Sequence, residues 1–328
     1  MKVLISGCGS GFGRGLAVAL LRRGAHVIAT EPDVTGLEAD LRGAAGDVGT
    51  LEVHPLDVAR SEQVRAVAVA AGAVDVLVNN AGYAFFGTLE EGSSEAFARL
   101  LDVNVVGVHR LTRAMLPGLR ERGGVVVMVS SIAGRTVFPE SGFYAATKYA
   151  VEAMAEALFQ ETCSFGVRIR LVEPGSFDTN FLPTAMALSV ARTPDSPYAP
   201  LRETWDARKV SVLEAPQDPT LVVDAILASL EDDRPFLRVP VGLDAARILA
   251  VRDALSPDGW VRLAAARLGC DPGHEPGDVL PPGQALVAPV DDLGPTLVAW
   301  RAGHLDHWAD LPRGPEALRR LAQLAVDP

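Results

Sequence analysis

Short apolar runs alternate with helical stretches along the N-terminal half of the chain, and this alternation strongly restricts what the chain can fold into. Each run holds four to six residues, mostly Val, Leu and Ile, without the polar alternation of a half-exposed strand. Strands of that kind are buried on both faces, as in parallel sheets. We therefore predict an α/β fold, a Rossmann-like doubly wound parallel sheet with helices on both faces. The predicted strands are Val3–Ser6, His26–Thr30, Leu51–Leu56, Val74–Val78, Val125–Val129, Val167–Val172 and, last, Phe236–Val241.

Composition and charge narrow the classes of partner. The chain has 328 residues, of which 48% are hydrophobic, enough for a sizeable core. Its formal net charge of -11 disfavours nucleic acid and anionic membrane surfaces as partners. Cys8, Cys163 and Cys270 lie far apart without metal-binding spacing, so we expect reduced thiols and no metal. The N-terminal MKVLISG enters a strand at once and no apolar run reaches membrane-spanning length, so we expect a soluble, cytoplasmic protein.

A glycine-rich turn follows the first predicted strand. The sequence GCGSGFGRG comes after Val3–Ser6 and before the predicted helix Leu16–Arg23, and it places glycines at positions 7, 11 and 13. Glycines let a phosphate approach the backbone, and a helix N-terminus supplies unpaired N–H groups and a positive dipole end. Such a turn can also serve only to reverse the chain. Its position directly after the first strand favours a phosphate-binding turn.

Glu31 ends the second predicted strand, about twenty residues after the glycines. A carboxylate there can accept hydrogen bonds from an adenosine ribose and would repel a 2′-phosphate. The glycine turn before Gly11 carries no Arg or Lys. These features favour NAD(H) over NADP(H), although a solvated loop carboxylate is the alternative interpretation of Glu31.

Ser131, Tyr144 and Lys148 form the candidate catalytic group. Tyr144 and Lys148 are four residues apart in the predicted helix Tyr144–Cys163, so they share one helical face, and Ser131 follows a buried strand. An ammonium beside a phenol favours the phenolate and makes the tyrosine usable as an acid or base. Taken alone, Tyr144 and Lys148 could also be a surface pair. Asn104, within the predicted helix Ser93–Leu116, either has a role in holding water or is a core amide bonded to the backbone.

These motifs, in this order, resemble the classical short-chain dehydrogenase/reductases. The similarity covers about residues 1–250, with Ser6 in place of the commoner threonine before the first glycine. Several stretches, such as NAGYAFFGTLEE, are similar to the branch that holds hydroxysteroid and retinol dehydrogenases and many bacterial relatives. The motif residues are Ser6–Gly13, Asp57, Val58, Asn79–Gly82, Asn104, Ser131, Tyr144, Lys148 and Pro174–Thr179.

The resemblance implies a role for each of these positions. Tyr144 would be the general acid/base, Lys148 would lower its pKa and hold the nicotinamide ribose, and Ser131 would bind the substrate oxygen. Asn104 would hold a water that relays protons to Lys148. The glycine turn would bind the pyrophosphate, Glu31 the adenosine ribose and Thr179 the carboxamide. The implied cofactor-binding residues are Gly7, Ser10, Gly11, Phe12, Gly13, Glu31, Asp57, Val58, Asn80, Ala81, Gly82, Tyr144, Lys148, Pro174, Gly175, Phe177 and Thr179.

The C-terminal third is expected to shape the substrate side. Residues 1–255 would form the NAD-binding domain, with a substrate lid at about 180–215 whose apolar residues suit either a lipophilic substrate or ordinary packing. Residues 256–328 would form an extension with helices at Ser256–Leu268, Leu297–Leu311 and Gly314–Val326 around a Pro/Gly-rich segment. This extension either covers the pocket or contacts another subunit. His304 and His307 lack the further ligands of a metal site.

We therefore expect an NAD(H)-dependent oxidoreductase that interconverts a secondary alcohol and a ketone on a fairly apolar, small-to-medium substrate. Three alternatives stay open: a ketoreductase or tailoring enzyme of secondary metabolism, an epimerase or lyase that recycles the cofactor, and a catalytically idle NAD-binding regulator. The resemblance also implies a homodimer or homotetramer.

Overall fold

The computed structural model describes residues 1–209 and 216–268. The chain divides into two compact units. One comprises Met1–Ala199 and Ala215–Ala245, and it contains the sheet and every predicted site residue. The other comprises the rest of the chain, in which the structure describes residues 200–209 and 246–268. The predicted helices Leu297–Leu311 and Gly314–Val326, His304, His307 and Cys270 lie outside the described residues.

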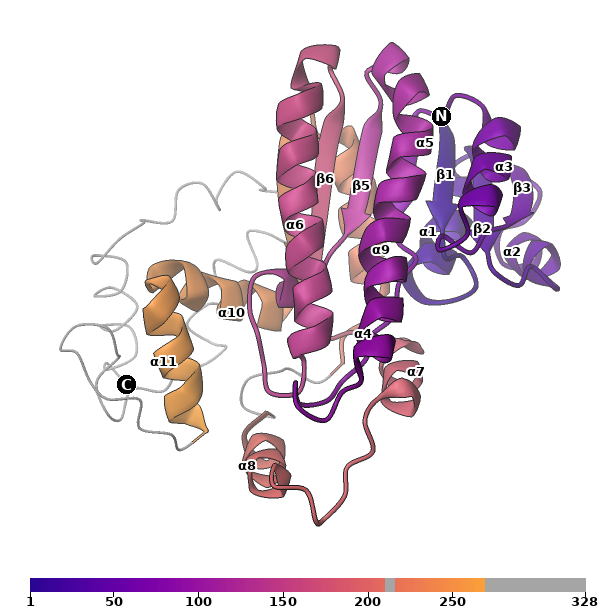
Figure 1. The fold of residues 1–328 in the computed structure, drawn as a ribbon. Coiled ribbons are helices and arrows are strands. Elements are labelled where there is room, and N and C mark those ends of the chain that lie inside the picture. The colour runs from indigo at the N-terminus through magenta and orange to yellow at the C-terminus, as the bar shows by residue number, and fades with distance from the viewer. Residues whose placement is uncertain (210–215, 269–328) are drawn as a thin grey trace. The chain divides into compact units, whose positions relative to one another are not determined.

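Seven parallel strands form a single sheet within the described residues, in the order β3-β2-β1-β4-β5-β6-β7 (Figure 1). The chain runs outward from β1 through β2 to β3 and then returns to the other side of β1 with β4. The carboxyl ends of β1 and β4 therefore flank the topological switch point, where sheets of this kind bind ligands. The strands are β1 (Lys2–Ser6), β2 (His26–Glu31), β3 (Thr50–Pro55), β4 (Val76–Asn79), β5 (Val125–Val129), β6 (Arg168–Pro174) and β7 (Phe236–Val241).

Helices connect the strands. Those of the first unit are α1 (Gly11–Arg22), α2 (Leu37–Ala45), α3 (Ser61–Ala71), α4 (Ser94–Leu101), α5 (Val108–Arg122), α6 (Gly142–Thr162), α7 (Phe181–Leu188) and α9 (Thr220–Glu231). A π-helical segment, η1 (Asp102–Gly107), joins α4 to α5, and short 3₁₀ turns occur at η2 (Ile132–Gly134) and η3 (Cys163–Phe165). The remaining helices are α8 (Ala199–Lys209), α10 (Leu243–Ala254) and α11 (Pro257–Arg267).

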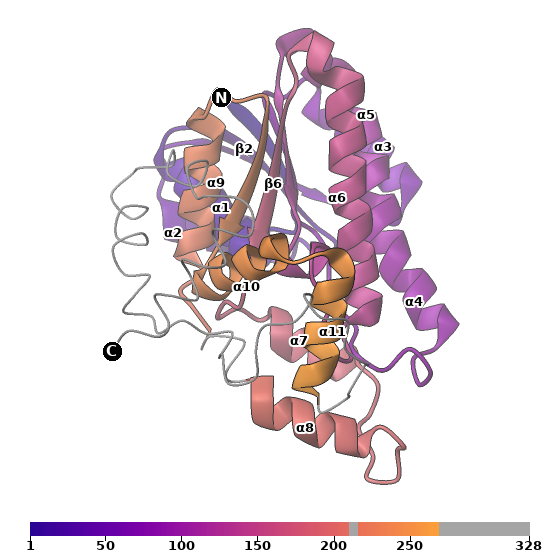
Figure 2. The same ribbon diagram turned by 90° about the vertical axis from the view of Figure 1, so that its left-hand side faces the viewer.

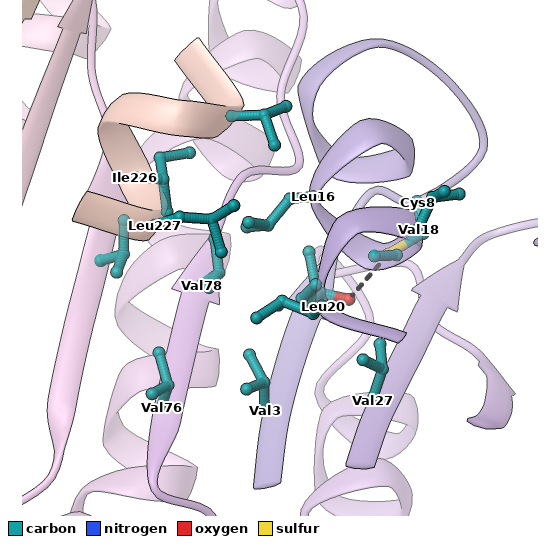
Figure 3. Close-up of a cluster of buried hydrophobic side chains, with 14 of the residues drawn as sticks. Val3, Cys8, Leu16, Val18, Leu20, Val27, Val76, Val78, Ile226 and Leu227 are labelled. Atoms are coloured by element: carbon teal, nitrogen blue, oxygen red, sulfur yellow. Dashed lines mark hydrogen bonds between the residues drawn. The ribbon is translucent and has the colours of Figure 1, made fainter. Parts of the chain in front are cut away.

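Alternate residues of each strand enter two hydrophobic cores, because side chains alternate between the faces of a sheet. On one face, Val3, Val27 and Val78 pack against α1, α2 and α9 (Figures 2 and 3). On the other face, Leu4 and Leu77 pack against α3, α5 and α6 (Figure 2). Because both faces of the sheet are buried, the central strands consist of consecutive apolar residues in the sequence.

Cys8 and Arg170 are polar members of this interior. The Cys8 thiol donates to the Ile5 carbonyl at 3.5 Å, and burial raises its pKa to about 12 (Figure 3). It is a free, buried thiol, whereas Cys163, also free, is exposed. Arg170 on β6 is fully buried and donates to the carbonyls of Ser229 and Arg234 just beyond the sheet, at 2.6 Å and 2.7 Å. These bonds satisfy a buried guanidinium and fix the end of α9 and the approach to β7.

The predicted sheet is confirmed, whereas several helix boundaries differ. Helix α1 begins at Gly11 because the glycine turn itself forms the first helical turn, and not at Leu16 as predicted. The predicted helix Ser93–Leu116 is divided by η1, where the backbone hydrogen bonds change from the i→i+4 pattern of an α-helix to the i→i+5 pattern of a π-helix. Helices α2 and α10 were not predicted from the sequence. The helix predicted at Ser256–Leu268 is present as α11, with the Ser256 hydroxyl accepting from the Gly259 N–H at 3.0 Å.

Candidate active site

The glycine turn lies at the carboxyl end of β1, and its geometry requires glycine. Gly7 and Gly11 have φ values of +79° and +56°, in the left-handed region that favours glycine. Gly13 has a different constraint, because a Cβ atom there would lie 2.0 Å from the Gly7 carbonyl oxygen. Ser10 is the exposed N-cap of α1, and Phe12 lies in its first turn. Helix α1 therefore begins directly after a tightly folded turn, with Ser10 as its N-cap.

Asn80 fastens this turn to the end of β4. Its side-chain amide donates to the carbonyl oxygens of Ser6 and Gly7 at 2.9 Å and 2.8 Å. The Ser6 hydroxyl in turn accepts from the backbone N–H groups of Asn80 and Ala81, both at 3.1 Å. The predicted residues Asn80 and Ala81 thus meet the glycine turn across the switch point. Gly82 continues toward Asn104, whose Oδ1 would lie 3.0 Å from a Cβ atom on Gly82.

Glu31 extends from the end of β2 over the same turn. Its Oε2 atom accepts a hydrogen bond from the Gly9 N–H at 2.9 Å in an exposed position. This places an anionic oxygen beside the turn, where the sequence predicts an adenosine ribose. Asp57 and Val58 follow β3 as predicted, and Val58 packs closely against Gly107 of η1.

The segment after β6 lies against the start of α1. Phe12 and Phe177 pack edge to face, with ring centroids 5.6 Å apart, and Thr179 lies 3.8 Å from the position of a Cβ atom on Gly11. Pro174 is the last residue of β6. The motif at positions 174–179 and the glycine turn therefore contribute to one site.

Two residues that sequence reasoning missed hold this segment. Asp244 is 1% exposed, and its Oδ2 atom accepts from the Ser176 N–H at 2.7 Å. Gln217 accepts from the Asp178 N–H through its backbone carbonyl at 2.9 Å and donates from its side chain to Asp244 at 3.2 Å. A Cβ atom on Gly175 would lie 1.9 Å from the Asp244 carboxylate, so Gly175 is needed for this contact. An acidic residue just beyond Gly242 at a strand end was a usable sequence signal for Asp244, whereas nothing distinguishes Gln217.

Ser131 and Tyr144 meet at the carboxyl end of β5. The Ser131 hydroxyl accepts from the Ala133 N–H at 3.1 Å and lies 3.5 Å from the Pro174 carbonyl oxygen. Burial raises the pKa of the Tyr144 phenol, and a hydrogen bond with Ser131 opposes that rise. The phenol is therefore held in its protonated form, with Ser131 as its hydrogen-bonding neighbour.

Lys148 lies one helical turn beyond Tyr144 and is also buried. Its Nζ atom donates to the Val129 carbonyl at 2.8 Å and lies 5.7 Å from the centroid of the Tyr144 ring. Burial lowers the pKa of Lys148 to about 8, and the carboxylate of Glu152 opposes this change. The expected lowering of the Tyr144 pKa by Lys148 is not found: burial raises that pKa, and Ser131, not Lys148, opposes the rise.

Asn104 lies in the π-helical segment η1 and is 2% exposed. Its Nδ2 group donates to the Tyr83 carbonyl at 2.8 Å and to the Thr147 hydroxyl at 3.1 Å, and its Oδ1 accepts from the Tyr83 N–H at 3.1 Å. Both side-chain N–H groups are thus bonded to protein, as the core-amide alternative requires. These bonds fasten η1 to α6 one residue before Lys148.

An apolar wall faces the Tyr144 ring. Phe86 and Phe181 have ring centroids 6.3 Å and 5.7 Å from that of Tyr144, and Ala185 on α7 is buried beside it. Other apolar side chains of α7 are exposed, among them Leu182, Met186 and Leu188. Helix α7 lies in the predicted lid region and supplies an aromatic side chain next to the phenol.

Neither a membrane span nor a metal cluster occurs in the described part of the chain. No helix within residues 1–209 and 216–268 combines the length and apolar character needed to cross a bilayer. The same residues contain no group of three or more His, Cys, Asp or Glu side chains placed to hold a metal ion.

The fold and this site define a dinucleotide-binding α/β protein with a Ser–Tyr–Lys group at the carboxyl edge of its sheet. The sequence profile of the family described as short chain dehydrogenase matches residues 1–187. Human retinol dehydrogenase 8 is 39% identical over 251 residues, which cover 72% of this chain and 79% of that protein. Human 17-beta-hydroxysteroid dehydrogenase type 1 is 36% identical over 248 residues, which cover 72% of this chain and 76% of that protein. The chain belongs to the short-chain dehydrogenase family of oxidoreductases.

Solved structures agree with this assignment. A short-chain dehydrogenase from Streptomyces avermitilis is 36% identical and superposes with a TM-score of 0.65, covering 76% of this chain and 92% of that one. A short chain dehydrogenase from Burkholderia cenocepacia, solved in complex with NADP, is 26% identical and superposes with a TM-score of 0.62. The match covers 82% of this chain and 99% of that one. The seven-stranded sheet is thus shared with members of the family.

Proposed function

We propose that this protein is an NAD(H)-dependent oxidoreductase that interconverts a secondary alcohol and a ketone on a fairly apolar substrate. The observation that carries the proposal is the group of side chains at the carboxyl end of β5: the buried Tyr144 phenol, Ser131 beside it near the Pro174 carbonyl, and Lys148 with its Nζ atom 5.7 Å from the centroid of the Tyr144 ring. Removal of hydride from a carbinol carbon requires a group that takes the hydroxyl proton. Tyr144 is the buried acid/base group that faces this site.

The residues at the switch point fit a dinucleotide. Gly7 and Gly11 leave partly exposed backbone where side chains would hinder a phosphate, and buried Gly13 lets α1 approach the Gly7 carbonyl. The N-terminus of α1 lies there with no acidic residue in its first turn. Glu31 supplies an acceptor beside Gly9, on the side where a ribose would bind. A bound nicotinamide ring would accept or supply the hydride at this edge.

The roles of the chain's own side chains follow from their positions. In ketone reduction, Tyr144 donates its phenolic proton to the oxygen that becomes the alcohol, and in oxidation it takes that proton back. Ser131 stays hydrogen-bonded to the same oxygen and stabilises the charge that develops on it. Lys148 presents a cation behind the phenol, which favours the phenolate when the proton has left. With both N–H groups of the Asn104 side chain bonded to protein, a water held by Asn104 would donate to one of its oxygen atoms, the backbone carbonyl or Oδ1.

Glu31 supports the choice of NAD(H). A 2′-phosphate on the adenosine ribose would meet the carboxylate that accepts from Gly9, and like charges repel. The relative from B. cenocepacia was solved with NADP, so the family alone does not decide between the two cofactors.

We expect Glu31→Ala to lower the ratio of kcat/KM for NAD to that for NADP by about tenfold, the effect of losing one hydrogen bond to a charged group. Steady-state assays with both cofactors measure this ratio. Asp33→Ala is the matched control, because it removes an exposed carboxylate two residues further on that accepts from the Thr35 N–H. Equal ratios for wild type and Glu31→Ala would contradict the ribose contact.

The aromatic wall supports a fairly apolar substrate. Phe86 and Phe181 flank Tyr144, and the similar human proteins are named for retinol and for a hydroxysteroid. A panel of secondary alcohols graded in hydrophobicity, assayed by NADH formation, tests the proposal. We expect kcat/KM to rise with apolar surface. Binding of NAD without turnover of any alcohol or ketone in the panel would favour an idle, nucleotide-sensing protein.

A further inference from the structure

A buried carboxylate holds the segment after β6 (residues 174–179). Asp244, in the first turn of α10, is 1% exposed, and its Oδ2 atom accepts from the Ser176 N–H at 2.7 Å. Its Oδ1 atom accepts from the Ala245 N–H at 2.9 Å and from the Gln217 side-chain amide at 3.2 Å. The chemistry proposed above uses neither Asp244 nor Gln217. Burial of an acid is costly, so its place here requires an explanation.

Gln217 joins the same segment through its backbone. Its N–H donates to the Ser176 carbonyl at 3.1 Å, and its carbonyl accepts from the Asp178 N–H at 2.9 Å. Its side-chain oxygen accepts from the Leu243 N–H at 3.0 Å. The segment after β6 is therefore fixed by two partners from different parts of the chain, and these partners are bonded to each other.

Two glycines allow the backbone to come this close to the carboxylate. A Cβ atom on Gly175 would lie 1.9 Å from Asp244 Oδ1. Gly242 has a φ of +105°, and a Cβ atom there would lie 2.8 Å from Gln217 Nε2 and 3.0 Å from Asp244 Oδ1. The chain on both sides is thus shaped to bring Asp244 into contact with the segment after β6.

This segment connects the two halves of the candidate site. At one end, the Pro174 carbonyl oxygen lies 3.5 Å from the Ser131 hydroxyl. At the other end, a Cβ atom on Gly11 of the glycine turn would lie 3.8 Å from the Thr179 side chain. A dinucleotide that extends from the glycine turn to Tyr144 must therefore meet this segment with its nicotinamide end.

We propose that Asp244 is a positioning residue for the nicotinamide ring of the cofactor: its carboxylate, together with Gln217, holds residues 174–179 in the conformation that receives this ring. The inference rests on the proposed function, which places a nicotinamide ring at this edge of the sheet. When only a fraction of the molecules has the binding-competent conformation, the apparent affinity falls by that fraction. Hydrogen bonds that keep the segment in one conformation therefore increase the affinity for NAD.

The donors around Asp244 favour its ionised form. Burial raises the pKa of Asp244, and the N–H groups of Ser176, Ala245 and Gln217 oppose this rise. A proton on either oxygen atom would face one of these N–H donors, whereas a carboxylate accepts from all three.

Asp244→Asn tests the inference by comparing two ligands. The substitution keeps the shape of the side chain but replaces an acceptor oxygen by an NH₂ group, which then faces the N–H of Ser176 or of Gln217. ADP-ribose is NAD without the nicotinamide ring. We expect the Kd for NAD to rise about tenfold, the effect of losing one hydrogen bond to a charged group, while the Kd for ADP-ribose stays within about twofold. Isothermal titration calorimetry measures both values and needs no turnover.

Asp218→Asn is the matched control. Asp218 directly follows Gln217, but it is exposed, and its Oδ1 atom accepts from the Thr220 N–H at the start of α9 at 2.8 Å. We expect both Kd values to stay within about twofold of wild type, as for an ordinary surface substitution. Equal rises of the two Kd values in Asp244→Asn, or no rise in either, would overturn the proposal.

A double variant provides a rescue. In Asp244→Asn combined with Gln217→Glu, the amide at position 244 can donate to the carboxylate at position 217, whose other oxygen still accepts from the Leu243 N–H. Gln217→Glu alone places two carboxylates face to face, so we expect it to weaken NAD binding. The double variant should bind NAD more tightly than either single variant, and weaker binding than both would contradict the proposed pairing.

Gln217→Ala keeps the test valid if Asp244→Asn does not fold. It removes the side chain that donates to Asp244 and leaves the backbone groups that bond Ser176 and Asp178. We expect the Kd for NAD to rise about threefold, as for one ordinary hydrogen bond, without a rise for ADP-ribose. An unchanged Kd for NAD would count against the proposal.

The binding measurements distinguish this inference from the proposed function. Binding of NAD without turnover of any alcohol or ketone would refute the proposed function and leave the role of Asp244 in place. Wild-type protein that binds no NAD would overturn both.

Discussion

Tyr144→Phe should lower kcat for hydride transfer by about three orders of magnitude while NADH affinity stays within about threefold. A positioned general acid or base contributes roughly 10²–10⁴-fold to a rate, and the substitution removes only the phenolic oxygen. The ring contacts with Phe86 and Phe181 are kept, so the apolar wall should not collapse. Single-turnover kinetics with NADH and a reactive ketone measure the chemical step, and fluorescence titration measures NADH binding.

Tyr149→Phe is the control for this experiment. Tyr149 lies on the same helix α6, five residues further on, and its side chain is exposed. We expect its removal to leave kcat and NADH binding unchanged. Turnover by Tyr144→Phe at more than a few per cent of wild type would refute the acid/base assignment, and loss of NADH binding in that variant would indicate a role for the phenol in cofactor binding.

Gly13→Ala should abolish NAD binding and lower the free energy of unfolding by at least about 2 kcal/mol. The added methyl group would lie 2.0 Å from the Gly7 carbonyl oxygen and 2.5 Å from the Asn80 amide, so the turn or α1 must move. Overpacking of a well-packed interior typically costs about 1–3 kcal/mol, and this contact is with rigid backbone. Denaturant unfolding and NAD titration measure the two effects.

Gly43→Ala is the control for Gly13→Ala. It distinguishes the effect of the close contact at Gly13 from the effect that alanine has at any helical position. Gly43 lies in α2, is exposed, and has no atom within 4 Å of an added Cβ. We expect the variant to be as stable as wild type or more stable by up to about 1 kcal/mol, because alanine favours helix over glycine. Similar behaviour of the two variants would show that the close approach of Gly13 to Gly7 is not required.

The sheet could be predicted because its signal is local. Most of the strands are apolar runs whose residues enter one core or the other, and runs such as Val125–Val129 need no partner sequence to be identified. The edge strand β3, with Glu52 and His54, is less apolar. The glycine turn, Ser131, Tyr144 and Lys148 could be predicted for the same reason, since each stands at a fixed offset from such a run.

Features that depend on contacts between distant residues could not be predicted. The π-helical segment arises where Asn104 binds the backbone of Tyr83, twenty-one residues away in sequence. Asp244 and Gln217 acquire their roles only when they meet the segment after β6. The burial of Tyr144, which raises its pKa, depends on residues from several elements. Sequence spacing placed Lys148 beside Tyr144 but did not reveal that the buried phenol has a raised pKa.

The hydrogen bonds from Asn80 have a thermodynamic consequence for ligand binding. They join the turn after β1 to the end of β4, so this turn behaves as part of the sheet and not as a free loop. The entropy of ordering the turn is then lost once, during folding, and not at each encounter with a dinucleotide. If the turn binds a dinucleotide as proposed, its binding is linked to the integrity of both strands. We then expect saturation with cofactor to protect the central strands of the sheet against unfolding.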